Sequence, residues 1–185
     1  MVDCTTLPIE TERLILRRFV PSDIEAAHKN WASHPEVQLE YGEPVYDTVE
    51  KTAGLINGYI AKYEQPNIFR WAIELKENGQ CIGQIAYFEI VPHHNFAEIE
   101  YCIGTEYQNK GYATEATKAV ISFGFEHMKL HKVQICRRSN NPRSGRVIEK
   151  CGFHYDGTLR DAIIFDGKYV DRLYYSILES EYKPF

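Results

Sequence analysis

Long hydrophobic runs are missing from this sequence of 185 residues, whose apolar stretches are short and strand-like, as at 133–136. A helix that crosses a bilayer needs about 20 consecutive apolar residues. The first six residues also lack the basic start and the apolar core of a secretory signal. We therefore expect no membrane-spanning segment and no membrane partner, and we expect the protein in the cytoplasm.

Cysteine is scarce, with 5 residues that form no C-x-x-C pair. A disulfide framework uses an even number of cysteines, and a zinc ribbon uses closely spaced pairs. The sequence therefore predicts no disulfide framework and no metal site, and it favours small core side chains as the role of most of these residues. The cysteines are Cys4, Cys81, Cys102, Cys136 and Cys151.

Positive charge is in deficit, because 21 Lys and Arg residues stand against 26 Asp and Glu residues, for a formal net charge of −5. A nucleic-acid-binding surface normally carries a basic stripe, so we expect no nucleic-acid partner. The acidic excess is compatible with a cationic substrate, but it is more often a matter of solubility alone.

The length and the hydrophobic content of 44% fit one globular domain over residues 1–185, without internal repeats or linkers. In the first third, apolar alternation predicts a strand at 13–19. The capping-box pattern that begins at Ser22 predicts a helix from there to about residue 34. We expect a connector at 36–46 and a second helix that opens at 47–50 and extends to Tyr63.

The remaining two thirds predict further strands and two more helices. We expect strands at 69–76, 81–91, 97–104, 131–138, 153–165 and 169–178, with helices at 111–127 and 141–151. Tight turns at 77–80 and 166–167 would make hairpins of the strands on either side. The predicted order, β-α-α-β-β-β-α-β-α-β-β, indicates an α+β fold with a mixed sheet.

The segment 108–113, with the sequence QNKGYA, leads from a predicted strand directly into a helix. A helix N-terminus exposes backbone N–H groups and positive potential, and Gly111 has no Cβ to block a phosphate. A glycine at a helix start is by itself a common turn. The strand before it and the helix after it favour a pyrophosphate site, and the absence of a Walker lysine–serine pair argues against a P-loop nucleotide.

A second candidate half-site opens the short helix at 141–151. Asn141 suits the N-cap position and Pro142 suits the first helical position. These residues could therefore serve only to start the helix. Ser144 occupies the third helical position, where a capping box would have Glu or Gln. Its hydroxyl is therefore available for a ligand.

Together, the segments 107–116 (YQNKGYATEA) and 141–153 (NPRSGRVIEKCGF) resemble the two signature stretches of the GCN5-related N-acetyltransferases. The opening ETERLILR at 10–17 and the ending GKYVD at 167–171 are similar to the ribosomal-protein-alanine N-acetyltransferase-like branch of that superfamily. The resemblance covers nearly the whole chain. It implies a central, mostly antiparallel twisted sheet of about seven strands flanked by four helices.

This resemblance implies acetyl-CoA as cosubstrate, a primary amine as acceptor and no metal. The pyrophosphate would bind the backbone amides of 108–113, and the pantetheine arm would pair like an extra strand with the backbone of 101–103. Asn141 would hydrogen-bond the pantetheine, and Ser144 would lie near the thioester sulfur. The implied cofactor-binding residues are Tyr101, Cys102, Ile103, Gln108, Asn109, Lys110, Gly111, Tyr112, Ala113, Asn141 and Ser144.

Two positions depart from the family pattern. Many members carry a tyrosine seven residues after the asparagine, as an acid for the leaving thiolate, but this chain has Ile148 there. Tyrosine acid catalysis at that position is excluded, and Ser144 or a bound water would replace it. Glu100 stands where the branch usually has glycine, which leaves the shape of the acceptor side of the cleft open.

Attack by an amine needs a proton acceptor, because an ammonium group has no lone pair. Glu98 and Glu100 are two apart on a predicted strand, so both carboxylates project from one face, where charged residues could also simply face solvent. The resemblance ranks Glu98 first as the base, from its offset from Gln108, and Glu100 second, for proton transfer or substrate binding. A backbone N–H of Cys102 or Ile103 would bind the oxyanion.

Other interpretations stay open. His93 and His94 are expected to be surface residues or acceptor contacts and not metal ligands. An acetyl-cysteine on Cys102 or Cys136 would be chemically competent, but direct attack suffices and core packing explains both residues. A non-catalytic acyl-CoA-binding module and a different nucleotide-binding enzyme are the alternative functions. The acceptor is left as a protein N-terminus, a polyamine or an aminoglycoside, and a homodimer is left as a hypothesis.

Overall fold

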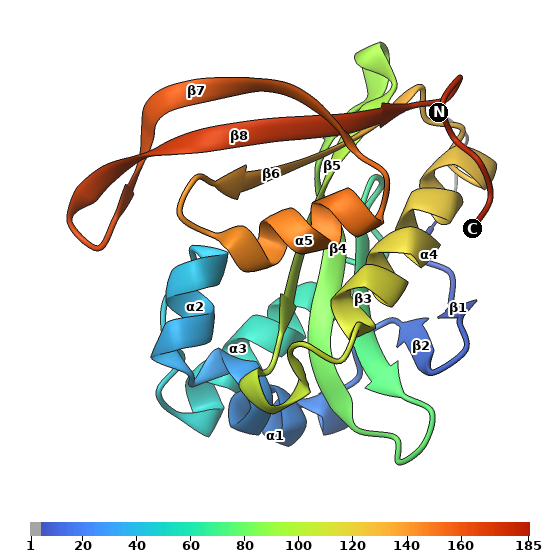
Figure 1. Ribbon diagram of the computed structural model, residues 1–185. Helices are drawn as coiled ribbons and strands as arrows, with labels where there is room; N and C mark the ends of the chain where they lie inside the picture. Colours follow the sequence, from blue (N-terminus) through green and yellow to red (C-terminus); the bar gives the residue numbers. More distant parts are fainter. Residues whose placement is uncertain (1–4) are drawn as a thin grey trace.

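One sheet of eight strands organises residues 5–185, which a computed structural model describes (Figure 1). The strand order is β1-β2-β3-β4-β5-β6-β8-β7, and only β5 and β6 pair in parallel. The α+β prediction is confirmed, with the short β1 as the eighth strand. The strands are β1 (Ile9–Glu10), β2 (Leu14–Arg17), β3 (Phe69–Leu75), β4 (Cys81–Val91), β5 (Phe96–Ile103), β6 (Lys132–Arg138), β7 (His154–Phe165) and β8 (Lys168–Leu178).

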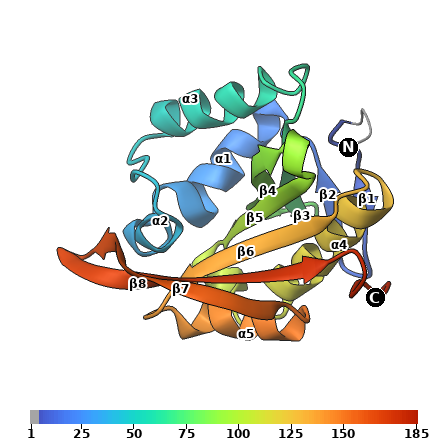
Figure 2. The same cartoon turned by 90° about the horizontal axis from the view of Figure 1, so that it is seen from above.

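Helices cover both faces of this sheet (Figure 2). One face carries α1 (Ile24–Ala27), α2 (Pro35–Tyr41) and α3 (Val49–Ile60). The other face carries α4 (Tyr112–Glu126) and α5 (Pro142–Lys150). A 3-10 turn at Pro21–Asp23 and a π-helical turn at His28–Ala32 extend α1 at its two ends.

An apolar core lies on each face of the sheet. On the α4 side, the rings of Trp71 and Phe123 meet edge-on with their centroids 5.2 Å apart. On the α1 side, Phe19 packs against Trp31 and Tyr59. Burial of a side chain of this size contributes roughly 1.5–3 kcal/mol. The sheet is therefore fixed from both sides, which holds the side chains on it in place.

The sheet opens between its two parallel strands. β5 and β6 pair only as far as Ile99 and Ile135, although β5 continues to Ile103 and β6 to Arg138. Figure 1 shows the two strands diverging beyond that point. Within residues 5–185, the backbone of 100–103 therefore has no strand neighbour on this side, and the opening positions the site described below.

The segment 36–46, predicted as a connector, contains most of α2. Pro35 starts this helix at the first helical position, and Gly42 ends it in the left-handed conformation with a φ of 85°. The helix is only 7 residues long, too short for an apolar period to stand out among the turn residues around it. The prediction of a connector was wrong for this reason.

Other boundaries follow the predictions closely. Thr48 caps α3 by accepting a hydrogen bond from the backbone N–H of Lys51 at 3.3 Å. Both predicted hairpin turns lie where expected, between β3 and β4 and between β7 and β8. The first helical segment differs, because Asp23 and not Ser22 provides its side-chain cap. The Asp23 carboxylate accepts a hydrogen bond from the backbone N–H of Val20 at 2.9 Å.

The cysteines that the structure describes are free thiols. Cys81, Cys102 and Cys151 are buried and Cys136 is half-buried, as predicted for small core side chains. Cys4 lies outside the described residues, as does most of the segment on which the absence of a secretory signal was predicted. No helix within residues 5–185 is long and apolar enough to cross a membrane.

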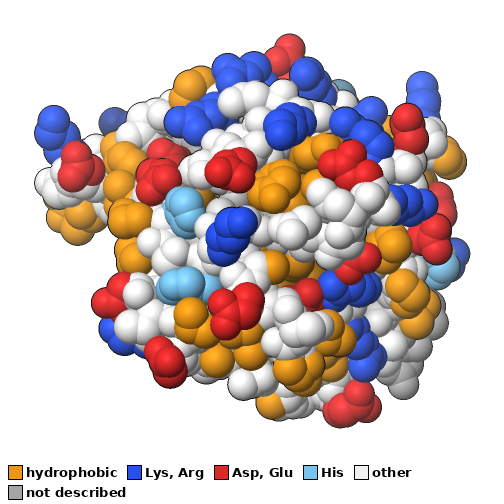
Figure 3. Space-filling model, turned by 90° about the horizontal axis from the view of Figure 1, so that it is seen from below, with side chains coloured by type: hydrophobic (Ala, Val, Ile, Leu, Met, Phe, Trp, Pro, Cys, Tyr) orange, Lys and Arg blue, Asp and Glu red, His pale blue; other side chains and the backbone are white. Residues whose placement is uncertain are grey.

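Charged side chains of both signs are interspersed on the face that carries α1 and the turn between β3 and β4 (Figure 3). Hydrophobic side chains lie between them in small groups. Such a mixture is typical of a solvated surface. This face therefore gives no sign of a polyanionic partner.

Candidate active site

A cavity of about 660 Å³ opens where β5 and β6 diverge. Its walls come from β5, β6, α2, α5, the start of α4 and the β7–β8 hairpin. Glu98 and Lys110 are not part of the wall, and His93 and His94 are exposed on a turn outside it. The predicted site residues that line the cavity are Glu100, Tyr101, Cys102, Ile103, Gln108, Asn109, Gly111, Tyr112, Ala113, Asn141 and Ser144.

The loop before α4 has a backbone that suits a phosphate. Gly111 caps the helix with a φ of 86°, and Asn109 is also left-handed, with a φ of 61°. The first helical hydrogen bond runs from the N–H of Glu115 to the carbonyl of Gly111, at 3.0 Å. The N–H groups of 111–114 therefore have no partner inside the helix, and the positive end of the helix dipole lies at the cavity.

Arg13 braces this loop, a role that the sequence did not reveal. Its guanidinium pairs with the Glu115 carboxylate at 2.6 Å and donates to the carbonyl of Lys110 at 3.0 Å. Glu115 also accepts hydrogen bonds from the Thr11 hydroxyl at 2.6 Å and from the backbone N–H of Arg13 at 2.8 Å. Burial acts to raise the pKa of Glu115, but these hydrogen bonds outweigh it and lower the pKa.

Basic side chains of α5 lie along the same cavity as the phosphate loop. Arg143, Arg146 and Lys150 all line the cavity. Arg143 donates to the amide oxygen of Gln108 at 2.8 Å, and the Gln108 amide nitrogen donates to the carbonyl of Ile103 at 3.0 Å. The loop is thereby tied to both α5 and β5, and the cations favour an anionic ligand.

The edge of β5 presents selected backbone groups to the cavity. The N–H of Gly104 donates to the carbonyl of Ile82 at 2.9 Å, and such bonded positions alternate along an antiparallel pair. In the register of β4 and β5, the backbone of Cys102 therefore bonds to β4, whereas the backbone groups of Tyr101 and Ile103 face the open side. Of the two predicted oxyanion donors, Cys102 and Ile103, only Ile103 has a backbone N–H on the open side.

The start of α5 brings Asn141 and Ser144 to the cavity. Asn141 Oδ1 accepts the backbone N–H of Ser144 at 3.0 Å, so the cap is complete without the serine hydroxyl. Asn141 Nδ2 donates to Glu40 at 2.8 Å, which leaves its second N–H for a ligand. Ser144 Oγ accepts a hydrogen bond from the Tyr101 hydroxyl at 3.3 Å. Ile148, at the family's tyrosine position, is buried in the core.

The two glutamates of β5 project from the same face of the strand, as predicted, but into different surroundings. Glu100 lines the cavity, where it accepts hydrogen bonds from Arg70 at 2.7 Å and from the Tyr41 hydroxyl at 2.5 Å. Glu98 is only 1% exposed and lies behind the wall. It pairs at 3.3 Å with Arg172, which does line the cavity. Glu98 therefore reaches the cavity only through the wall residues Arg172 and Cys136.

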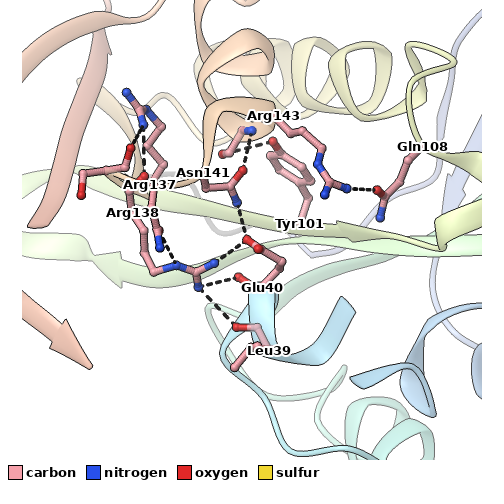
Figure 4. A network of polar contacts seen from close by, with 11 residues as sticks. Leu39, Glu40, Tyr101, Gln108, Arg137, Arg138, Asn141 and Arg143 are labelled. Carbon is pink, nitrogen blue, oxygen red and sulfur yellow. Dashed lines mark hydrogen bonds and ion pairs between the residues drawn. The ribbon is translucent and has the colours of Figure 1, made fainter. Parts of the chain in front are cut away.

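A polar network that sequence reasoning missed closes one end of the cavity (Figure 4). Arg138 forms an ion pair with Glu40 of α2 and donates to the carbonyls of Leu39 and Glu40 at 3.3 and 3.1 Å. Its guanidinium also lies 3.8 Å from the ring centre of Phe165 in β7. Because Glu40 also accepts from Asn141, the network ties α2, β6, α5 and β7 together. No sequence signal placed Glu40 here, since α2 itself was not predicted.

The thiols at the cavity are poor nucleophiles. Cys102 and Cys136 both line the cavity, but burial raises the pKa of each to about 12. Only a thiolate attacks a thioester readily, and little thiolate forms at neutral pH when the pKa is so high. This geometry favours packing as the role of both residues.

Comparison with known proteins identifies the family. A family model described as "Acetyltransferase (GNAT) domain" matches residues 13–154, which include the phosphate loop, β5 and α5. YoaA of Bacillus subtilis (strain 168), named an uncharacterized N-acetyltransferase, is 32% identical over 171 residues, which are 92% of this chain and 96% of YoaA. YdaF of the same organism, a putative ribosomal N-acetyltransferase, is 34% identical over 57% of this chain and 58% of its own length.

A solved structure of a named N-acetyltransferase has a similar fold. The crystal structure of spermidine N-acetyltransferase from Vibrio cholerae, in complex with CoA and spermine, matches with a TM-score of 0.79 and 25% identity, over 92% of this chain and 98% of that one. The shared fold and the matched family model agree with the resemblance of the two signature segments. The chain therefore belongs to the GNAT family of acetyltransferases, which transfer an acetyl group from acetyl-CoA to an amine.

Proposed function

We propose that this chain, as a single domain, lets a primary amine attack the thioester of acetyl-CoA directly, in one ternary complex. One observation carries the proposal: a helix N-terminus, an unpaired strand edge and the Asn141–Ser144 end of α5 all converge on one cavity. A non-catalytic acyl-CoA-binding module is the alternative. In such a module the Glu100 carboxylate would serve only to pair with Arg70.

Acetyl-CoA supplies an activated acetyl group, and we assign the residues that would hold it. The free N–H groups at 111–114 and the cations of α5 suit its phosphates. The open backbone groups of Tyr101 and Ile103 suit the amides of its pantetheine arm, which would lie like an added strand. The remaining N–H of Asn141 suits a pantetheine carbonyl.

The transfer forms a bond between nitrogen and carbon and breaks the bond between carbon and sulfur, and the amine must lose a proton. We propose Glu100 as the acceptor of that proton, directly or through solvent, because it lines the cavity. Glu98 would then act only through its neighbours Arg172 and Cys136, which reverses the order that the resemblance implied. The N–H of Ile103 would stabilise the oxyanion, and the Ser144 hydroxyl would face the departing sulfur.

The charges in the cavity favour an acceptor with a single ammonium group. Of the three carboxylates in the wall, Glu40 pairs with Arg138 and Glu100 pairs with Arg70. Among residues 5–185, Glu43 is the one wall carboxylate that has no ion pair. A polyamine carries several ammonium groups and would need several free carboxylates. We therefore propose a peptide N-terminus or a small monoamine ahead of a polyamine.

The test is an acceptor screen that follows free thiol released from acetyl-CoA. Ribosomal-protein N-terminal peptides, small monoamines, aminoglycosides and spermidine are compared at equal concentrations. We expect amine-dependent thiol release, with the highest kcat/KM for an acceptor that carries one ammonium group. Preferred turnover of spermidine would contradict the charge argument, and stable CoA binding without any thiol release would favour the non-catalytic module.

A further inference from the structure

We propose that Tyr101 is a positioning residue for Ser144. It donates a hydrogen bond to the serine oxygen and thereby directs the serine's own hydrogen toward the thioester sulfur. This inference rests on the proposed function, in which Ser144 lies beside that sulfur. The resemblance implies a role only for the backbone of Tyr101, in pairing with the pantetheine arm, and none for its side chain.

The two residues approach each other from different elements. Tyr101 lies on β5 and Ser144 on α5, both line the cavity, and their oxygens are 3.3 Å apart. Figure 4 shows the Tyr101 ring extending toward the start of α5, close to Asn141. The contact is long for a hydrogen bond between two hydroxyl groups, which is usually about 2.5–3.0 Å.

The hydrogen-bonding capacity of Ser144 fixes what Tyr101 does to it. A serine hydroxyl has one hydrogen and two lone pairs. Tyr101 donates to a lone pair, and the helix cap uses the serine's backbone N–H and not its hydroxyl. Among residues 5–185, the serine hydrogen has no acceptor of its own. It is therefore free to point into the cavity.

Tyr101 keeps its proton while it performs this role. Burial raises the pKa of Tyr101 to about 12, although its hydrogen bond to Ser144 acts in the opposite direction. At neutral pH the phenol therefore keeps its hydrogen, which it donates to the serine oxygen. Because Tyr101 occupies one lone pair of the serine oxygen, the serine's hydrogen and its second lone pair remain for the ligand side. A sulfur that gains negative charge accepts that hydrogen.

Neither Tyr101 nor Ser144 has to give up a proton in the chemical step. As the carbon–sulfur bond breaks, the electron pair leaves with sulfur, and Ser144 donates a hydrogen bond to the growing negative charge. The proton lost by the amine goes to Glu100 or to solvent. With Ile148 buried in the core, α5 itself supplies no tyrosine, and the hydroxyl from β5 reaches the site from the other wall.

The test compares single-turnover rates of acetyl transfer for the Tyr101→Phe variant, the Ser144→Ala variant and the double variant. We expect Tyr101→Phe to lower the rate about threefold to tenfold, as for the loss of one hydrogen bond. It should have no further effect in the Ser144→Ala background, and CoA affinity should stay near the wild-type value. Tyr175→Phe is the matched control, because Tyr175 does not line the cavity, although its hydroxyl accepts a contact of the same 3.3 Å length from the wall residue Arg137. We expect its rate to be unchanged.

Several outcomes would overturn the inference. A wild-type rate for Tyr101→Phe would do so, as would the same loss with and without Ser144, or a loss of CoA affinity in place of rate. An unchanged rate for Ser144→Ala would remove both residues from the chemistry while acetyl transfer itself stands. If the wild-type protein released no thiol with any amine, the proposed acetyl transfer would be contradicted, and the role of Tyr101 with it.

Discussion

Single residues at the cavity show that a carboxylate on the right strand is not enough to identify a base. Glu98 and Glu100 are two positions apart on β5 and therefore share a face of the strand. Their partners distinguish them, because Arg172 separates Glu98 from the cavity while Glu100 forms part of the wall. These partners come from segments far away in the chain, so the spacing of the glutamates alone could not rank them.

The first prediction concerns this pair. Glu100→Gln should lower kcat about a hundredfold with CoA affinity retained, the usual loss for a missing general base. Glu98→Gln should lower kcat less, because it acts through Arg172. The measurement is steady-state kinetics beside calorimetric CoA titration. A fully active Glu100→Gln variant, together with an impaired Glu98→Gln variant, would restore the order that the resemblance implied.

The second prediction concerns the thiols. Cys136→Ala and Cys102→Ala should each keep kcat within about threefold of the wild-type value, because their high pKa leaves little thiolate. Intact-protein mass spectrometry after incubation with acetyl-CoA alone should show no acetylated enzyme. A stable acetyl adduct that disappears in either variant would instead indicate a cysteine intermediate.

At the scale of elements, the junction of β5, the phosphate loop and α4 was predictable from the sequence. The contacts of Arg13 that hold the loop in place were not. This junction can be predicted because the strand, the glycine and the helix follow one another directly in the chain. Arg13 and Glu115 are 102 residues apart, and no local rule pairs them. The same holds for Glu40 and Arg138, which are 98 residues apart and meet only because α2 folds beside β6.

The third prediction tests the phosphate loop. Gly111→Val should abolish the rise in melting temperature that CoA causes, because a side chain would occupy the phosphate path and strain a backbone with a φ of 86°. In the wild type, CoA at a hundred times its Kd should stabilise the protein by about 2.7 kcal/mol. Gly79→Val is the control, since it has a similar φ of 70° in the β3–β4 turn, outside the cavity. It should lose stability but keep the CoA shift.

The fourth prediction uses the brace of that loop. The pKa of Glu115 is lowered in the folded protein, so its pairing stabilises the fold above the unfolded pKa of about 4.3 and is lost as the pH falls through the folded value. At pH 7, Glu115→Gln should lower the melting temperature by a few degrees. The difference from wild type should shrink as the pH drops below about 4. A difference that stayed constant down to pH 3 would show that the charge of Glu115 is not what holds the loop.

At the scale of the whole molecule, the opening between β5 and β6 decides where chemistry can occur. The sequence predicted a mixed sheet and the order of its elements, because apolar periodicity and turn residues are local signals. It could not predict that two parallel strands pair at one end and separate at the other. Nor could it predict that a short helix and a hairpin tip would close one end of the cavity. We propose that those segments determine which acceptor binds.

The most direct test of acetyl transfer at this cavity is amine-dependent thiol release from acetyl-CoA, measured for the wild type and for Gly111→Val and Glu100→Gln. We predict release by the wild type with at least one amine, loss at subsaturating acetyl-CoA in Gly111→Val, and loss at saturating acetyl-CoA in Glu100→Gln. Release that is undiminished in both folded variants would place the reaction elsewhere. CoA binding by the wild type without release for any amine would contradict direct acetyl transfer altogether.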